Sequence, residues 1–297
     1  MIHTSVPPRA AAVRTAALRL AHIHWQVFER RGPFTEWGRT YIDDLLRSHG
    51  LAVDEGCFAE GRVTFAEMIS AMLPGLAPYD DRFDLALLAH ATPDAEPGRP
   101  MSRLSASIPE AGLVIAISEQ GITSPFTALR LAGSRIVVPE SRRALVVIAD
   151  QSVLFHLQPV PELLRARCDA AAVLVLDESG ELGSFSAEHH TGVAPEEVSS
   201  LLAGWLANLA AETARPLVIA GSGLTDHCNE STADVDLVRA PAGMPCVGLW
   251  STFADELPRL RPACRTVVLA DYEAQLGYLG LCRVDVAVNR ADAVAQC

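Results

Sequence analysis

The sequence of 297 residues is 49% hydrophobic and 20% charged, which is typical of a globular protein with a large core. Its net charge of −12 argues against binding to the phosphate backbone of nucleic acids. All 24 basic residues are arginines, and the absence of lysine excludes a Schiff-base lysine, a pyridoxal-phosphate anchor, a P-loop lysine and a Ser–Lys dyad.

The seven cysteines are dispersed along the chain, and no two of them have CxxC spacing. This pattern gives no support to a disulfide framework or a zinc site, and it favours a reducing, cytoplasmic location. Arginines interrupt every apolar run in residues 1–22, so we expect neither a secretory signal nor a membrane span there. The sequence predicts no cofactor and no metal.

The first part of the chain, residues 1–63, has the least regular pattern. Residues 16–27 predict a strand, and residues 41–50 predict a short amphipathic helix that a glycine ends. Thr64 and Glu67 have the spacing of a capping box, which predicts the start of a further helix.

The central stretch runs from Leu113 to Ala132. The apolar run LVIAIS predicts a buried strand, and the following EQGIT predicts a sharp turn. Ser124 and Pro125 then predict the start of a helix, with Ser124 as its N-cap. A helix N-terminus has unpaired N–H groups and partial positive charge, which lower the pKa of a nucleophile or hold an oxyanion. This turn, residues 118–124, is called the elbow below and is a candidate catalytic site.

After the elbow, residues 169–192 predict a β-hairpin that turns at 178–180. His189 and His190 lie near its end, and adjacent strand residues face opposite sides, so these two imidazoles are not expected in one site. Residues 194–216 predict an amphipathic helix that begins with acidic residues and ends before a proline.

Similar apolar runs occur twice along the chain, in the same order and at nearly constant spacing. The pairs are LALLAH and LVIAGS, LVIAIS and CVGLWS, and LVVIAD and VVLAD. The helix from Ser124 is matched by one from Ser251, which predicts a longer elbow in the first copy. The sequence therefore predicts two related halves in which strands alternate with helices, a layered α/β architecture.

Four segments follow one another in a recognisable order: TPD, an elbow helix ending in ALRLA, ALVVIADQS and DAAAVLVLDE. Over about residues 64–290, this order resembles the thiolase-like superfamily and its β-ketoacyl-acyl-carrier-protein synthase III branch. The resemblance implies a duplicated five-layer αβαβα sandwich. Its N-terminal half would span residues 1–192, with 1–63 as an extension, and its C-terminal half residues 193–297. It also implies a dimer formed through strand 113–118 and an acyl thioester of CoA or acyl carrier protein as ligand.

The family's chemistry requires a cysteine at the elbow, a histidine after the first strand of the second half, and an asparagine or histidine after its middle strand. The elbow has no cysteine. The position of the histidine falls on Gly221–Gly223, and His227 lies a few residues further along the sequence. The position of the asparagine falls on Leu249 or Trp250. The resemblance thus implies a degenerate active site, and ordinary condensation is not expected.

One interpretation is a divergent enzyme of polyketide or fatty-acid-type secondary metabolism that performs acyl transfer or related thioester chemistry. Ser118 or Ser124 would be the hydroxyl nucleophile, Glu119 or His227 the base, and Gln120 a residue of the pocket. However, Ser124 is equally explained as an N-cap and Ser118 as the end of a strand.

Two other interpretations are non-catalytic. In one, the chain is an inactive ketosynthase-like partner subunit of a heterodimer, as chain-length factors are in aromatic polyketide synthases. In the other, it is a homodimeric scaffold. All three assume that the elbow has lost its thiol, so a distant cysteine placed beneath the Ser124 helix with an imidazole beside it would contradict them.

Overall fold

The structure is a computed structural model. It describes residues 18–30, 32–79, 82–96, 99–108, 111–134, 142–210, 215–228, 235–263 and 265–288. In chain order the strands and helices are β1 (Arg19–Phe28), α1 (Glu36–Ser48), α2 (Phe65–Met72), β2 (Leu85–His90), α3 (Arg99–Ser107), β3 (Leu113–Ile117), α4 (Ser124–Ser134), β4 (Arg143–Asp150), β5 (Asp169–Asp177), β6 (Gly183–His190), α5 (Pro195–Ala210), β7 (Leu217–Ala220), β8 (Asp236–Arg239), α6 (Val247–Leu260), β9 (Thr266–Glu273) and β10 (Tyr278–Val286).

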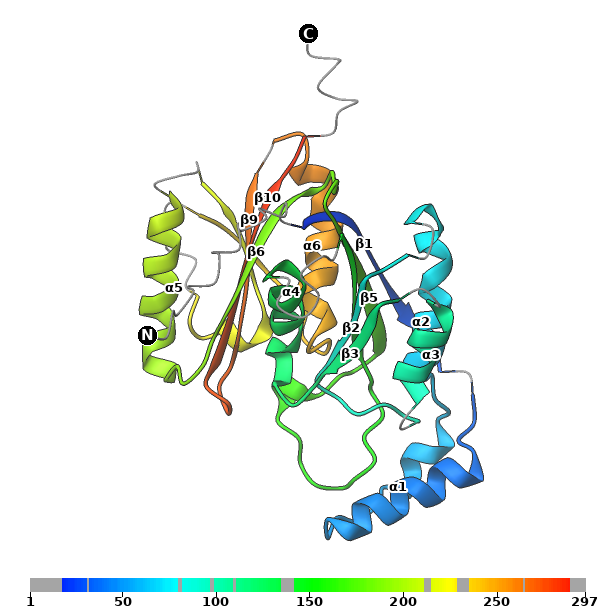
Figure 1. Cartoon of the computed structure of the whole chain (residues 1–297). Helices are drawn as coiled ribbons and strands as arrows, with labels where there is room; N and C mark the ends of the chain where they lie inside the picture. Colours follow the sequence, from blue (N-terminus) through cyan, green and yellow to red (C-terminus); the bar gives the residue numbers. More distant parts are fainter. Residues whose placement is uncertain are drawn as a thin grey trace, which may run out of the picture.

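The strands form two groups of five within one sheet, in the order β3-β2-β4-β5-β1 and β6-β10-β9-β7-β8. The two groups meet only at a short pairing of Arg19 and Leu20 with Ser184 and Gly183. Helices α4 and α6 lie between the groups, with α2 and α3 outside the first group and α5 outside the second (Figure 1). The predicted five-layer αβαβα sandwich is confirmed.

The two halves have the same order of elements. The series β1-α2-β2-β3-α4-β4-β5 corresponds to β6-α5-β7-β8-α6-β9-β10. The repeats LALLAH with LVIAGS and LVVIAD with VVLAD are therefore confirmed, because they form β2 with β7 and β4 with β9. Strands that are buried on both faces have continuous apolar sequences, which is why the sequence shows these pairs most clearly.

The third predicted repeat is wrong. CVGLWS forms the N-terminus of α6, and β8 takes the place that corresponds to β3. Strand β8 is short and only partly buried, so its sequence DLVR gives no apolar run. Helices α4 and α6 do correspond to each other. The segments that precede them, residues 118–123 and 240–246, are of similar length, so the prediction of a longer elbow in the first copy is also wrong.

The predicted hairpin of β5 and β6 does not form, because β1 lies between these two strands. β5 pairs along β1, whereas β6 pairs with β10. The turn between them holds β1 in place, since Leu182 N donates to Leu20 O and Arg19 Nε donates to Gly180 O. The boundary between the two halves, expected between residues 192 and 193, stays a prediction. Strand β6 precedes this boundary in the sequence but belongs to the second group of strands.

The apolar core has three main layers. One lies between the two groups of strands around α4 and α6, one under α2 and α3, and one under α5. Helix α4 lies very close to β10, since a Cβ atom added to Gly280 would lie 2.3 Å from Phe126 Cδ2. The first turn of α4 therefore lies deep between the halves. Among the described residues, no helix combines the length and the hydropathy that a membrane crossing requires.

The predicted capping box at the start of α2 is confirmed. Thr64 Oγ1 accepts from Glu67 N at 3.1 Å, and Glu67 Oε2 accepts from Thr64 N at 2.7 Å. We expect Thr64→Ala to lower the free energy of unfolding by about 1 kcal/mol, because Glu67 N at the helix terminus loses its acceptor. Urea denaturation measures this, with Thr40→Ala on exposed α1 as the control. Equal losses in both variants would contradict a stabilising cap.

Candidate functional site

The elbow connects β3 to α4 through a tight turn. Two residues in it have positive φ angles, Glu119 at 62° and Gly121 at 54°. A 3₁₀ turn, Gly121–Thr123, then leads directly into α4. A positive φ is unfavourable for glutamate, and such strain is typical of functional sites. The predicted strand, elbow and helix are confirmed.

Ser124 is fully buried, and its hydroxyl donates to carbonyl groups. Its Oγ lies 2.9 Å from Gly121 O and 3.2 Å from His90 O. The predicted N-cap role is wrong, because the 3₁₀ turn extends the helical path upstream and Ser124 itself has helical φ and ψ angles.

The other predicted site residues lie apart from Ser124. Ser118 and Glu119 are exposed at the outer end of β3. Gln120 serves the turn, since its Oε1 accepts from Thr127 Oγ1 at 2.5 Å. His227 packs on the ring of Tyr272 with a centroid distance of 5.6 Å, and its carbonyl accepts from α5. The predicted pairing of Ser118 or Ser124 with His227 has no contact that supports it, and the catalytic roles stay predictions.

Thr123 and His189 meet at the elbow, which the sequence did not predict. Thr123 Oγ1 lies 3.1 Å from His189 Nε2 and donates to Gln120 O at 2.7 Å. Thr123 is 0% exposed. Burial, followed by Arg130 and His190, lowers the pKa of His189, so its imidazole is neutral at physiological pH.

The predicted opposite orientation of the two adjacent histidines is consistent with their contacts. His190 pairs with Glu188 on its own strand, whereas His189 reaches the elbow. The strand position of His189 was visible in the sequence, but its partner depends on where β6 lies relative to α4. That placement follows from the sheet order and has no local sequence signal.

A cysteine from a distant part of the sequence lies next to the elbow, although no imidazole contact of its sulfur is seen among the described residues, and the loss of the catalytic thiol stays a prediction. Cys246 precedes α6, and its Sγ donates to Gly121 O at 3.8 Å. Burial raises the pKa of this thiol well above its ordinary value, and Asp150, Asp271 and Glu273 raise it further. Because the thiolate is the nucleophilic form, this environment disfavours the reactive form of Cys246.

The two central helices receive carboxylates from opposite halves. Asp150, at the end of β4, accepts from Cys246 N at 2.9 Å and Val247 N at 2.8 Å, and so caps α6. Glu273, at the end of β9, lies against the elbow, since a Cβ atom added to Gly121 would lie 2.4 Å from Glu273 Oε2. A helix N-terminus favours negative charge and leaves its first amides unpaired. Asp150 therefore satisfies the first amides of α6.

The carboxyl groups between the halves are hard to ionise. Burial raises the pKa of Asp150 to about 7 and that of Asp271 to about 8. It also raises the pKa of Glu273, whose Oε2 has no hydrogen-bond partner among the described residues. Asp271 Oδ1 accepts from Gly223 N and Tyr272 N, both at 2.9 Å. The site is thus a closed cluster of acidic groups around a neutral thiol.

The predicted asparagine position is wrong. Leu249 and Trp250 lie inside α6, where both are buried in the central core. The error follows from reading CVGLWS as a strand. In contrast, Gly221–Gly223 do follow β7 as expected, and they pack against Asp271. Within the described ranges, no group of three or more His, Cys, Asp or Glu side chains is arranged to hold a metal.

No protein-family model matches the sequence, and the search of curated proteins finds no relative. Solved structures of similar fold include 3-oxoacyl-(acyl carrier protein) synthase III, FabH, from Pseudomonas aeruginosa PAO1 (15% identity, 91% of this chain and 98% of that chain, TM-score 0.51). ChlB3, an acyltransferase, has 16% identity over 92% of this chain and 98% of its own, with a TM-score of 0.60. OleA from Xanthomonas campestri has 11% identity over 91% of this chain and 98% of its own, with a TM-score of 0.58. The chain therefore has the thiolase-like fold of the β-ketoacyl-acyl-carrier-protein synthase III type.

Proposed function

We propose that this protein is a ketosynthase-like subunit of cytoplasmic polyketide or fatty-acid-type metabolism that forms no acyl-enzyme and assembles with a cysteine-bearing ketosynthase-like chain. The observation that carries the proposal is that Asp150, from the first half, accepts from Cys246 N and Val247 N at the N-terminus of α6, while Glu273 of the second half lies against Gly121 of the elbow. Acyl transfer needs such donors free for the developing oxyanion.

The other requirements of acyl transfer point the same way. The thioester must reach a nucleophile, but Thr123 and Ser124 are each 0% exposed. The nearby sulfur of Cys246 is a neutral thiol surrounded by acidic groups. This combination favours a non-condensing role over enzyme chemistry at the elbow.

Strand β3 is the surface on which we expect the partner. It lies at one end of the sheet order and pairs only with β2 among the described strands. Its apolar side chains are incompletely covered, since Leu113, Val114 and Ile115 are half-buried and Ala116 is exposed. An apolar edge strand readily pairs with a strand of another chain.

Size-exclusion chromatography with light scattering tests the assembly. The protein is mixed with a cysteine-bearing ketosynthase III-like chain from the same organism, and a one-to-one complex is expected. Ala116→Lys is expected to weaken association by about tenfold or more, because it places a charge in the paired edge. Leu201→Lys on α5 is the matched control, since Leu201 is a 44% exposed surface residue.

Two outcomes would contradict the proposal. A homodimer that ignores the cysteine-bearing chain would support the scaffold interpretation. A complex that Ala116→Lys and Leu201→Lys weaken equally would place the interface elsewhere than β3.

A second function, acyl transfer by a hydroxyl nucleophile, is favoured by one contact. Thr123 Oγ1 and His189 Nε2 are 3.1 Å apart at a helix N-terminus, the arrangement in which an imidazole activates a hydroxyl. The burial of Thr123 and its hydrogen bond to Gln120 O argue against it. An acyl adduct that Thr123→Val abolishes would support this function, because valine has the same shape without the hydroxyl.

A further inference from the structure

A cavity of about 220 Å³ lies beneath α1. It is bounded by α1 and by the loops that follow β2 and β4, and α1 lies to one side of the sandwich (Figure 1). Its walls are mostly apolar and include Ile42, Leu46, Val153 and Phe155. An apolar cavity of about 150 Å³ holds a benzene molecule, so this one has room for a hydrocarbon chain of about eight carbons.

One side of this cavity borders the elbow. Ala91, which lines the cavity, follows His90, whose carbonyl oxygen accepts from Ser124 Oγ at 3.2 Å. Leu164, which also lines the cavity, ends a short 3₁₀ turn that lies next to Gly121–Thr123. A molecule in the cavity would therefore lie between α1 and the elbow.

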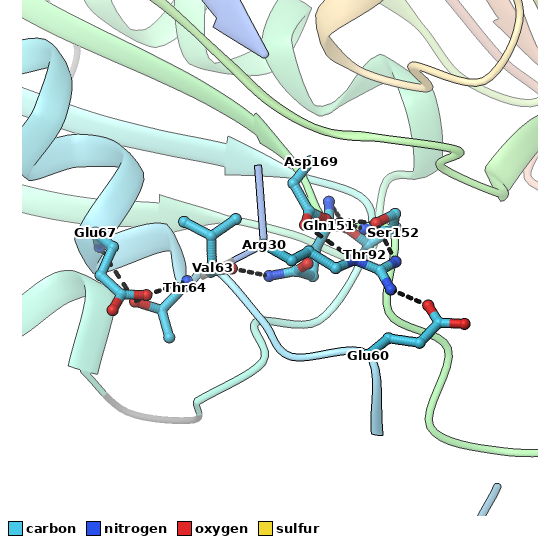
Figure 2. A network of polar contacts seen from close by, with 9 residues as sticks. All are labelled: Arg30, Glu60, Val63, Thr64, Glu67, Thr92, Gln151, Ser152 and Asp169. Atoms are coloured by element: carbon cyan, nitrogen blue, oxygen red, sulfur yellow. Dashed lines mark hydrogen bonds and ion pairs between the residues drawn. The ribbon is translucent and has the colours of Figure 1, made fainter. Parts of the chain in front are cut away.

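The loop after β4, which forms another wall of the cavity, is held in place by hydrogen bonds. Gln151 N donates to Thr92 Oγ1 at 2.9 Å, and Ser152 N donates to Asp169 Oδ1 at 2.7 Å. Arg30 adds a hydrogen bond of 2.6 Å to Ser152 Oγ (Figure 2). A cavity whose walls are already positioned binds a ligand at a lower entropic cost.

Arg165 lies at the rim of the cavity, since it belongs to the lining and is exposed to solvent. Its guanidinium makes no hydrogen bond or ion pair with a described residue, and Glu162, the nearest acidic residue in the sequence, pairs with Arg167 instead. Acidic residues outnumber arginines by 36 to 24 in this chain. An arginine that stays unpaired beside an apolar cavity in such a protein is available to an anion.

The other ionisable residues of the lining are Asp94 and His156. Asp94 Oδ1 accepts from Phe65 N at 2.9 Å at the start of α2, while Asp94 Oδ2 and His156 Nδ1 are buried. Among the described lining residues, Arg165 is thus the one permanent positive charge. A negative charge on Asp94 would direct an anionic head group away from the interior and toward this rim.

We infer that this cavity binds an amphipathic anion, with a hydrocarbon chain of about eight carbons inside and an acidic head group paired with Arg165. A guanidinium donates two parallel hydrogen bonds to a carboxylate or to a phosphate, so a fatty acid and an alkyl phosphate share this chemistry. Binding requires neither acyl transfer nor a partner chain, so the inference does not rest on the proposed function.

Isothermal titration calorimetry on the full chain tests the inference with octanoate, octyl phosphate, octanamide and octylamine. Octanoate is expected to bind at one site, about tenfold or more tightly than octanamide, which has the same shape but no charge. Tighter binding of octanoate than of octyl phosphate would identify a carboxylic acid as the class of ligand, and the reverse order would identify a phosphate monoester. Octanamide or octylamine binding as tightly as both anions, or no binding of either anion, would overturn the inference.

Two variants locate the head group and the chain. Arg165→Gln is expected to weaken octanoate about tenfold and to leave octanamide unchanged, because only the charged head group loses its partner. Arg259→Gln on α6, where the side chain is 81% exposed, is the matched control. Leu45→Trp enlarges a side chain of the lining that is 42% exposed, and it is expected to weaken octanoate and octanamide alike.

Urea denaturation of each variant checks that the fold is retained, which is expected because all three positions are exposed. An octanoate affinity that Arg165→Gln and Arg259→Gln change equally would overturn the inference. An octanoate affinity that Leu45→Trp leaves unchanged would place the ligand outside this cavity and would overturn it as well.

Discussion

The free energy of unfolding is expected to fall by several kcal/mol as the pH rises from about 4 to about 8. Burial raises the pKa of Asp150 from 3.8 to about 7 and that of Asp271 from 3.8 to about 8. The folded state therefore binds these protons more tightly than the unfolded chain. The resulting stability is fully present below the unfolded pKa and is lost as the pH rises through the folded pKa.

Asp271→Asn separates this effect from other titrations. Asparagine keeps the oxygen that accepts from Gly223 N and Tyr272 N, but it cannot ionise. We expect the variant to match the wild type below the unfolded pKa of 3.8, to be increasingly more stable than the wild type up to about pH 8, and to have a flatter pH profile. Urea denaturation across this range measures it, with exposed Asp44→Asn as control. Parallel profiles for wild type and Asp271→Asn would contradict the assignment.

Asp150→Ala is expected to lower the free energy of unfolding by about 3 kcal/mol or more. The variant leaves two buried amides, Cys246 N and Val247 N, without their acceptor. It also removes a contact that joins β4 of the first half to α6 of the second. We therefore expect the single unfolding transition to broaden or divide, since the halves lose part of their coupling.

The Asn variant and a surface control make this test specific. Asp150→Asn retains one acceptor and is expected to lose less than half as much stability as Asp150→Ala. Asp44→Ala, at an exposed position on α1, is expected to change stability by less than about 0.5 kcal/mol. Thermal and urea unfolding at about pH 6 measure all three variants. An Asp150→Ala variant as stable as Asp44→Ala would show that the cap contributes nothing.

Much of the fold could be predicted because its central strands are buried on both faces. β2, β4, β7 and β9 therefore have continuous apolar sequences that recur in order. The errors in predicting strands arose where a strand is only partly buried, or where it pairs with a strand that is distant in the sequence. β8 is too short and exposed to produce such a run, and nothing local indicates that β1 separates β5 from β6.

The location of the candidate site could be predicted, but its composition could not. The elbow has its own sequence signals in Gly121 and Pro125, whereas Cys246, Glu273 and His189 reach it from distant elements. One signal was available. Both LVVIAD and VVLAD end in aspartate, and an acidic residue after a buried run must find a partner. That requirement indicated acidic groups between the halves, though not which helix each would cap.

Intact-protein mass spectrometry after incubation with acyl-CoA tests most directly whether the elbow is closed to acyl transfer. A cysteine-bearing ketosynthase III treated in parallel should gain the mass of one acyl group. This protein is predicted to keep its unmodified mass, since Asp150 occupies the N-terminus of α6 and burial raises the pKa of the nearest thiol, Cys246. A stoichiometric acyl adduct on Thr123, Ser124 or Cys246 would contradict that account.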